Sequence, residues 1–109
     1  MNLRSRLEGP DVPTVDVVAA HERASDVVLL DVREVDEWIE VHAPGAHLRP
    51  LSALDLSTLP DAETFYVICR SGQRSAAAAQ AMIEGGLDAR NVVGGMNAWV
   101  QAGLPVEHG

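Results

Sequence analysis

The chain has 109 residues, of which 47% are hydrophobic, a length and composition suited to one globular core. Its formal net charge is −8, and all eight of its basic residues are arginines, a balance that argues against a nucleic-acid-binding surface. No apolar run approaches the ~18 residues needed to cross a bilayer, and residues 1–10 contain no hydrophobic segment typical of a signal peptide. The sequence therefore predicts a soluble, cytoplasmic protein that binds neither nucleic acid nor membranes.

The first half of the chain predicts two helices and two strands. Residues 1–11 are polar and of mixed charge, which predicts a flexible N-terminal arm before a single domain over residues 12–109. Thr14 is suited to cap a short helix that runs through residues 17–20 to about Arg23. The apolar run over residues 27–30 is typical of a strand buried on both faces. A second short helix is predicted over residues 34–41, and a weaker strand over 46–51, which Pro50 confines to the edge of a sheet.

The second half repeats the alternation of strand and helix. Residues 65–68 are β-branched, aromatic and apolar, which predicts a second buried strand. The alanine-rich stretch 75–84 predicts a helix that Gly85 and Gly86 end. Residues 91–93 are expected to form a third buried strand and residues 96–102 a closing helix, with Gly94 and Gly95 in a turn that lets the two pack closely. The order predicts an α/β fold, with a mainly parallel sheet covered by helices on both faces.

Cys69 is the only cysteine of the chain, so an internal disulfide and a cysteine-only metal site are excluded. The four histidines show no zinc-ligand spacing with it, and we predict no metal and no other cofactor.

Cys69 follows a predicted buried strand and precedes a predicted helix, the place where α/β sheets form their sites. The loop between them contains Ser71 and Gly72, which allow a tight curl with successive N–H groups turned inward. Such a loop and the following helix start lower the pKa of a thiol and would stabilise the charge of a persulfide. A cysteine after an apolar strand is otherwise only a small buried hydrophobic residue. The glycine and the nearby Arg70 and Arg74 favour the functional interpretation.

The segment from Cys69 to Ser75, Cys-Arg-Ser-Gly-Gln-Arg-Ser, resembles the active-site loop of the rhodanese-like family. Residues 31–46, with Asp-Val-Arg-Glu at their start and His-Ala-Pro-Gly-Ala at their end, resemble the family's segment before that loop. Residues 94–106, with Gly-Gly-Met-Asn-Ala-Trp and Gly-Leu-Pro-Val, resemble its C-terminal signature. The resemblance runs from about Val12 to Val106. It implies a rhodanese-like three-layer α/β/α fold with a mainly parallel sheet of about five strands.

The resemblance also implies a sulfurtransferase of the thiosulfate sulfurtransferase type. A small anionic donor such as thiosulfate would pass a sulfur atom to the Cys69 thiolate, and a thiol, cyanide or an acceptor protein would remove it from the resulting persulfide. Cys69 corresponds to the nucleophile of the family. The cradle for the outer sulfur corresponds to the backbone N–H groups of residues 70–75, which include Arg70, Gly72 and Ser75. Four side chains are expected to line the mouth and attract the donor: those of Arg70, Ser71, Gln73 and Arg74. Arg74 is also expected to hold carbonyls of the loop.

Asp31 and Arg33 follow the other strongly predicted strand, so we expect both at the same edge of the sheet. An ion pair that braces a loop and a direct role in catalysis are equally consistent with their position. Trp38, Trp99 and Met96 are expected to pack in the core.

Two alternatives remain open. Phosphatases of related folds place five residues between a cysteine and an arginine, whereas four separate Cys69 from Arg74, which predicts a cradle too small for phosphate. An arsenate reductase that relies on an internal disulfide is further weakened by the absence of a second cysteine. The other alternative is a non-catalytic or regulatory rhodanese module, or a sulfur carrier, that binds a partner protein. Such modules often lack the cysteine that this chain keeps.

Overall fold

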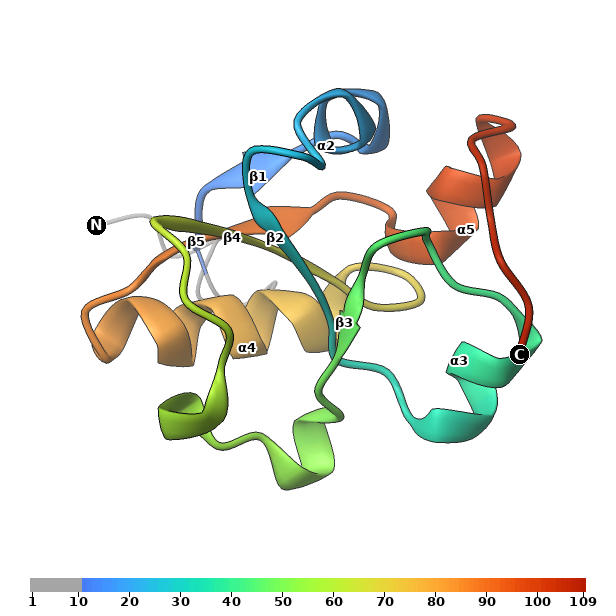
Figure 1. Ribbon diagram of the computed structural model, residues 1–109. Helices are drawn as coiled ribbons and strands as arrows, with labels where there is room; N and C mark the ends of the chain where they lie inside the picture. The colour runs from blue at the N-terminus through green and yellow to red at the C-terminus, as the bar shows by residue number, and fades with distance from the viewer. Residues whose placement is uncertain (1–10) are drawn as a thin grey trace.

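A parallel sheet forms the centre of the protein in a computed structural model that describes residues 11–109 (Figure 1). Its five strands lie in the order β1-β5-β4-β2-β3, and every pair of neighbours is parallel. Their bounds are β1 (Thr14–Val15), β2 (Val28–Asp31), β3 (His47–Leu48), β4 (Thr64–Ile68) and β5 (Asp88–Val92). The predicted arm over residues 1–11 lies outside the described residues except for Asp11.

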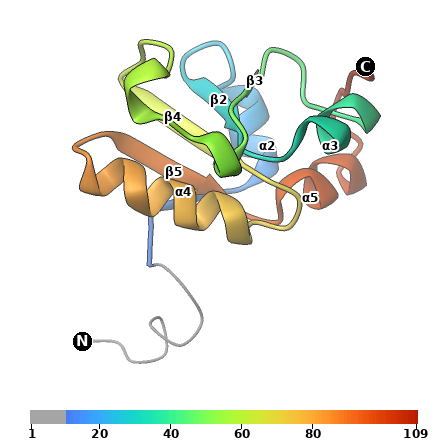
Figure 2. The same cartoon turned by 90° about the horizontal axis from the view of Figure 1, so that it is seen from below.

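Helices cover both faces of this sheet, which confirms the predicted three-layer α/β architecture. The helices of the described part of the chain are α2 (Val17–Glu22), α3 (Val35–Glu40), α4 (Gln73–Glu84) and α5 (Gly95–Gln101). Residues of α2 and α5 pack on one face, and α4 packs on the other (Figure 1). Two 3₁₀ turns, Leu51–Ala53 and Leu56–Thr58, lie over the same face as α4 (Figure 2).

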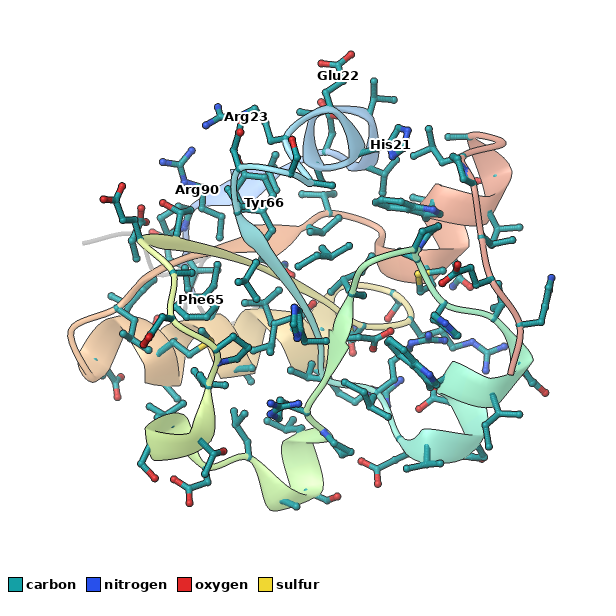
Figure 3. All side chains as sticks on the ribbon, viewed as in Figure 1. His21, Glu22, Arg23, Phe65, Tyr66 and Arg90 are labelled. Carbon is teal, nitrogen blue, oxygen red and sulfur yellow. The ribbon has the colours of Figure 1, made fainter. Side chains whose placement is uncertain are left out.

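The central strands are buried on both faces, which explains their continuous apolar runs. Tyr66 packs with Trp99 and other residues of the α2 and α5 side. Phe65, the preceding residue, packs with Met82 of α4. Figure 3 shows the side chains of Phe65 and Tyr66 on opposite sides of β4. Each face of the sheet therefore has its own apolar core.

The start of the domain differs from the prediction. Thr14 is not a helix cap but part of β1, an edge strand in which it lies opposite Asn91. The cap of α2 is Asp16, whose carboxylate accepts a hydrogen bond from the Ala19 N–H at 2.8 Å. Pairing with β5 places Thr14 and Val15 in the sheet, whereas the prediction had used them at the start of the helix. The strand was missed because two residues carry almost no sequence pattern.

The remaining elements match the prediction with shifted ends. The predicted edge strand is β3, shortened to two residues. The strand predicted over residues 91–93 begins earlier, at Asp88, because exposed and buried positions alternate from there. Trp99 and Met96 are core residues as predicted, whereas Trp38 is half-buried and stacks on His42 with ring centroids 3.8 Å apart. Among residues 11–109, no helix has the length and apolar character that crossing a bilayer requires.

Candidate active site

The loop that carries Cys69 lies at the edge of the sheet where the parallel strands end. Cys69 directly follows β4, Asp31 is the last residue of β2, and Gly94 and Gly95 follow β5 closely. Helices α3 and α5 lie at this same end of the molecule (Figure 1). The prediction that Asp31 lies at the same edge of the sheet as Cys69 is therefore confirmed.

Donors surround the sulfur of Cys69. The Gly72 N–H donates a hydrogen bond to Sγ at 3.1 Å, and the Ser75 hydroxyl lies 3.2 Å from the same atom. Gly72 has a φ of +102°, a left-handed conformation that only glycine adopts without strain, so this residue lets the loop curl around the thiol.

These contacts change the acidity of the thiol. Burial acts to raise the pKa of Cys69, but hydrogen bonds from the Ser75 hydroxyl and from the amides of Ser75, Gly72 and Ser71 act to lower it. The second effect is larger, so the pKa lies below the usual value of a cysteine. The curled loop thus stabilises the thiolate more than an ordinary cysteine environment does, in the direction that the sequence predicted.

The thiol lies beneath its loop rather than on the surface. Cys69 is only 1% exposed, and it belongs to the apolar core under α4 together with Val67 and Ala78. Between Cys69 and Ser75, the exposed residues are Arg70, Ser71 and Gln73. Cys69 therefore packs like a core residue while its sulfur faces polar hydrogen atoms.

The N-terminus of α5 donates backbone hydrogen bonds to the loop of Cys69. The Cys69 carbonyl accepts a hydrogen bond from the Met96 N–H at 2.8 Å, and the Arg70 carbonyl accepts one from the Asn97 N–H at 3.0 Å. A Cβ on Gly95 would lie 2.3 Å from the Cys69 carbonyl oxygen, so no other residue fits there. Close packing at this glycine was predicted, but its partner is the loop of Cys69 rather than the last strand.

Arg74 does not hold loop carbonyls, so this prediction is wrong. Its Nη1 and Nη2 donate to the two carboxylate oxygens of Glu37 at 2.7 and 2.8 Å. This ion pair, opposed by partial burial, lowers the pKa of Glu37 to about 2. Because α4 already begins at Gln73, Arg74 lies in its first turn, from which its side chain reaches α3. Glu37 is a site residue that the sequence analysis missed.

Asp31 and Arg33 form a buried ion pair. Arg33 Nη2 lies 2.8 Å from Asp31 Oδ2, and Arg33 Nε lies 3.0 Å from Oδ1. The guanidinium also donates to the carbonyls of Glu37 at 3.2 Å and Val41 at 2.7 Å, at the end of α3. Of the two roles left open by the sequence, these contacts agree with the brace, and a direct role in catalysis stays a prediction.

Asn91, in β5, is a second residue that the sequence analysis missed. Its Nδ2 donates to the Gly72 carbonyl at 3.0 Å, and its Oδ1 accepts from the Ser75 hydroxyl at 2.6 Å. Asparagine is unfavourable in strands, and its place in the strand predicted over residues 91–93 was the available signal. Asn91 connects the last strand to the middle of the loop, at Gly72, and to its end, at Ser75.

A cavity of about 330 Å³ lies beside the loop, between α3 and α5. Of the four side chains predicted to line the mouth, only Arg70 lines this cavity; Ser71 and Gln73 are exposed. Within residues 11–109, no three potential metal-binding side chains gather at one place. The residues that line the cavity are Arg33, Glu37, Glu40, Val41, Arg70, Met96, Asn97, Val100 and Gln101.

The sequence pattern of a known family, described as Rhodanese-like domain, matches residues 14–102 of the chain. The chain belongs to the rhodanese-like family.

Relatives and solved structures agree with this membership. The chain is 34% identical over 84 residues to a protein of Allochromatium vinosum named Sulfurtransferase. The matched region covers 74% of this chain and 78% of that protein. It is 43% identical over 82 residues to the protein slr1261 of Synechocystis, covering 72% of this chain but only 46% of that protein. The chain thus spans about half the length of this relative. The crystal structure of a rhodanese-related protein from Thermoplasma volcanium superposes with a TM-score of 0.83 at 31% identity, covering 87% of this chain and 97% of that one.

Proposed function

We propose that this rhodanese-like protein is a sulfurtransferase in which Cys69 carries the transferred sulfur as a persulfide. The observation that supports it most is the cradle of donors around Sγ, with the Gly72 N–H at 3.1 Å and a lowered thiol pKa. The A. vinosum relative, which is named a sulfurtransferase, supports the same reaction class.

The reaction we propose has two displacement steps. The Cys69 thiolate attacks the outer sulfur of thiosulfate, a bond forms between Sγ and that sulfur, and sulfite leaves with the electron pair of the broken S–S bond. The total charge of −3 is conserved, about −1 on the persulfide and −2 on sulfite. An acceptor thiolate or cyanide then attacks the outer sulfur, and the Cys69 thiolate is restored. In our proposal the amides of the loop stabilise the persulfide charge.

Arg70 and the cavity beside it are the proposed entry for the anionic donor and for the acceptor. Arg33 and Arg74 are each paired with a carboxylate, so their charges are largely neutralised. Arg70 is exposed, and no ion pair of Arg70 is found among residues 11–109. Of Arg33, Arg70 and Arg74, it is therefore the one whose charge remains available to an incoming anion.

The decisive experiment measures the intact mass of the protein after incubation with thiosulfate. Because Cys69 is the only cysteine, we expect a gain of one sulfur atom that a reducing thiol removes. Cys69→Ser should lose both this gain and the production of thiocyanate from thiosulfate and cyanide. Ser57→Ala, a change at an exposed position of the 3₁₀ turn Leu56–Thr58, is the matched control and should retain both.

A phosphatase assay on the same samples tests the main alternative. Hydrolysis of a phosphate ester that requires Cys69, without any gain of sulfur from thiosulfate, would refute the proposal. The single domain over residues 12–109, the cytoplasmic location and the absence of nucleic-acid and membrane binding stay predictions.

A further inference from the structure

The Ser75 hydroxyl lies between two atoms that both accept hydrogen bonds. Its oxygen is 2.6 Å from Asn91 Oδ1 and 3.2 Å from Cys69 Sγ. Ser75 is fully buried and Asn91 is 8% exposed, so water does not compete freely for these contacts. A hydroxyl carries one proton, and it cannot serve both neighbours fully at once.

The orientation of the Asn91 amide decides which neighbour receives this proton. The Gly72 carbonyl, 3.0 Å away, is only an acceptor, so the NH₂ group of Asn91 must face it. The amide oxygen of Asn91 then faces Ser75. Because this oxygen is also only an acceptor, the Ser75 proton points toward Asn91 in the resting protein.

The sulfur of Cys69 therefore meets a lone pair of the Ser75 oxygen rather than its proton. That arrangement suits a neutral thiol, which donates its S–H to Ser75. The hydroxyl lowers the pKa of Cys69 only through the orientation in which it donates to Sγ. When the thiol proton leaves to water, the hydroxyl has to turn from Asn91 to Sγ. The amides of the loop need no such turn, since their hydrogen atoms already face the sulfur.

We propose that Asn91 is a positioning residue that holds the Ser75 proton away from Cys69 and so opposes ionisation of the thiol. Asn91 and the thiolate compete for one hydrogen bond, and the loss of Asn91 would free it for the sulfur. The inference deepens the proposed function, because it concerns the thiol assigned there to carry sulfur.

Charged groups around Cys69 do not take part in this competition. The side chains concerned are the paired Asp31 and Arg33 after β2, the paired Glu37 of α3 and Arg74 of α4, and the exposed Arg70. Helix α5 carries no charged side chain. Changes at Asn91 or Ser75 leave all these groups in place, so a shift of the thiol pKa in such variants reports on the hydroxyl.

The test is the pH dependence of the rate at which iodoacetamide alkylates Cys69, the only thiol of the chain. It compares the wild type, Asn91→Ala, Ser75→Ala and the double variant. We expect Asn91→Ala to lower the apparent pKa by about one unit, since a hydrogen bond to a charged group is gained. We expect Ser75→Ala to raise it, and the double variant to titrate like Ser75→Ala alone. Gln80→Ala, which removes a half-buried amide on α4 that bonds only Glu84, is the control and should titrate like the wild type.

Three results would overturn the inference. They are an unchanged thiol pKa in Asn91→Ala, a raised thiol pKa in Asn91→Ala, and an equal decrease of the thiol pKa when Asn91→Ala is added to Ser75→Ala. A merely structural asparagine would loosen the loop and raise the pKa. Asn91→Val, a residue suited to a strand, replaces Asn91→Ala if near-ultraviolet circular dichroism shows that the alanine variant is unfolded. The readout does not involve sulfur transfer, so an unchanged pKa with normal sulfur gain refutes only the role of Asn91.

Discussion

Three arginines lie near the thiol, and their contacts divide them into two kinds. Arg33 holds Asp31 and the end of α3, and Arg74 holds Glu37. Arg70 points to the solvent side and lines the cavity. The first two stabilise the frame of the site, and the third is available to a ligand.

We predict that Arg70→Ala raises the apparent KM for thiosulfate several-fold to about tenfold, because one exposed cation contributes about 1 kcal/mol to the binding of an anion. For a neutral organic polysulfide the KM should change little. Steady-state kinetics with both donors provides the measurement. Arg90→Ala is the matched control, since Arg90 is an exposed arginine toward the other end of the sheet (Figure 3). Equal effects of Arg70→Ala on both donors would contradict the electrostatic argument.

At the level of residues, the sequence predicted the thiol and its loop because these features are local. The end of a strand, a cysteine, a glycine and the start of a helix follow one another closely, between Ile68 and Gln73. The partner of Arg74 was missed because Glu37 is distant in sequence and meets it only through the packing of α3 beside α4. Asn91 was missed for the same reason, since its contacts depend on β5 lying beside β4.

Helix α3 depends on polar contacts more than the other helices do. None of its residues is fully buried, and Val35 and Ile39 are exposed. The ion pair from Glu37 to Arg74 and the hydrogen bonds from Arg33 connect it to the rest of the domain. Its position at the cavity therefore depends on charge.

We predict that Glu37→Gln destabilises the protein by about 1 kcal/mol at pH 7, the usual size for a partly exposed ion pair. The pKa of Glu37 is lowered to about 2 in the folded state, so the stabilisation is complete above its ordinary value of 4.5 and is lost as the pH falls toward 2. Urea unfolding of both proteins across this range measures the difference. Glu63→Gln, in an exposed loop, should show no such pH-dependent difference. A constant difference at all pH values would mean that the effect comes from packing.

At the level of elements, the order of strands and helices was predictable because periodicity and chain punctuation record it. The strand order in the sheet was not predictable, because it does not follow the order of the strands in the chain: β1 pairs with β5, and β2 lies between β3 and β4. These neighbours depend on which apolar faces meet in the folded chain. Strand β1 itself, with two residues, is too short to carry a pattern.

The whole molecule carries a formal charge of −8 at pH 7, and like charges repel one another most strongly when the chain is compact. We predict that raising the NaCl concentration from about 10 to 200 mM increases the Tm at pH 7 by a few degrees, since salt screens this repulsion. Differential scanning calorimetry provides the measurement. Near the isoelectric point of about 4.7 the increase should disappear. A falling Tm at pH 7 would show that attractive pairs outweigh the net charge.

The packing of Gly95 on the loop of Cys69 has a consequence for protein engineering. The loop completes two of its carbonyl hydrogen bonds only with the first turn of α5, and Gly95 allows that approach. A seven-residue graft of Cys69–Ser75 onto another scaffold would leave those carbonyls without donors. The smallest transplantable unit is therefore discontinuous, and it consists of this loop together with the glycine pair and helix of the C-terminal segment.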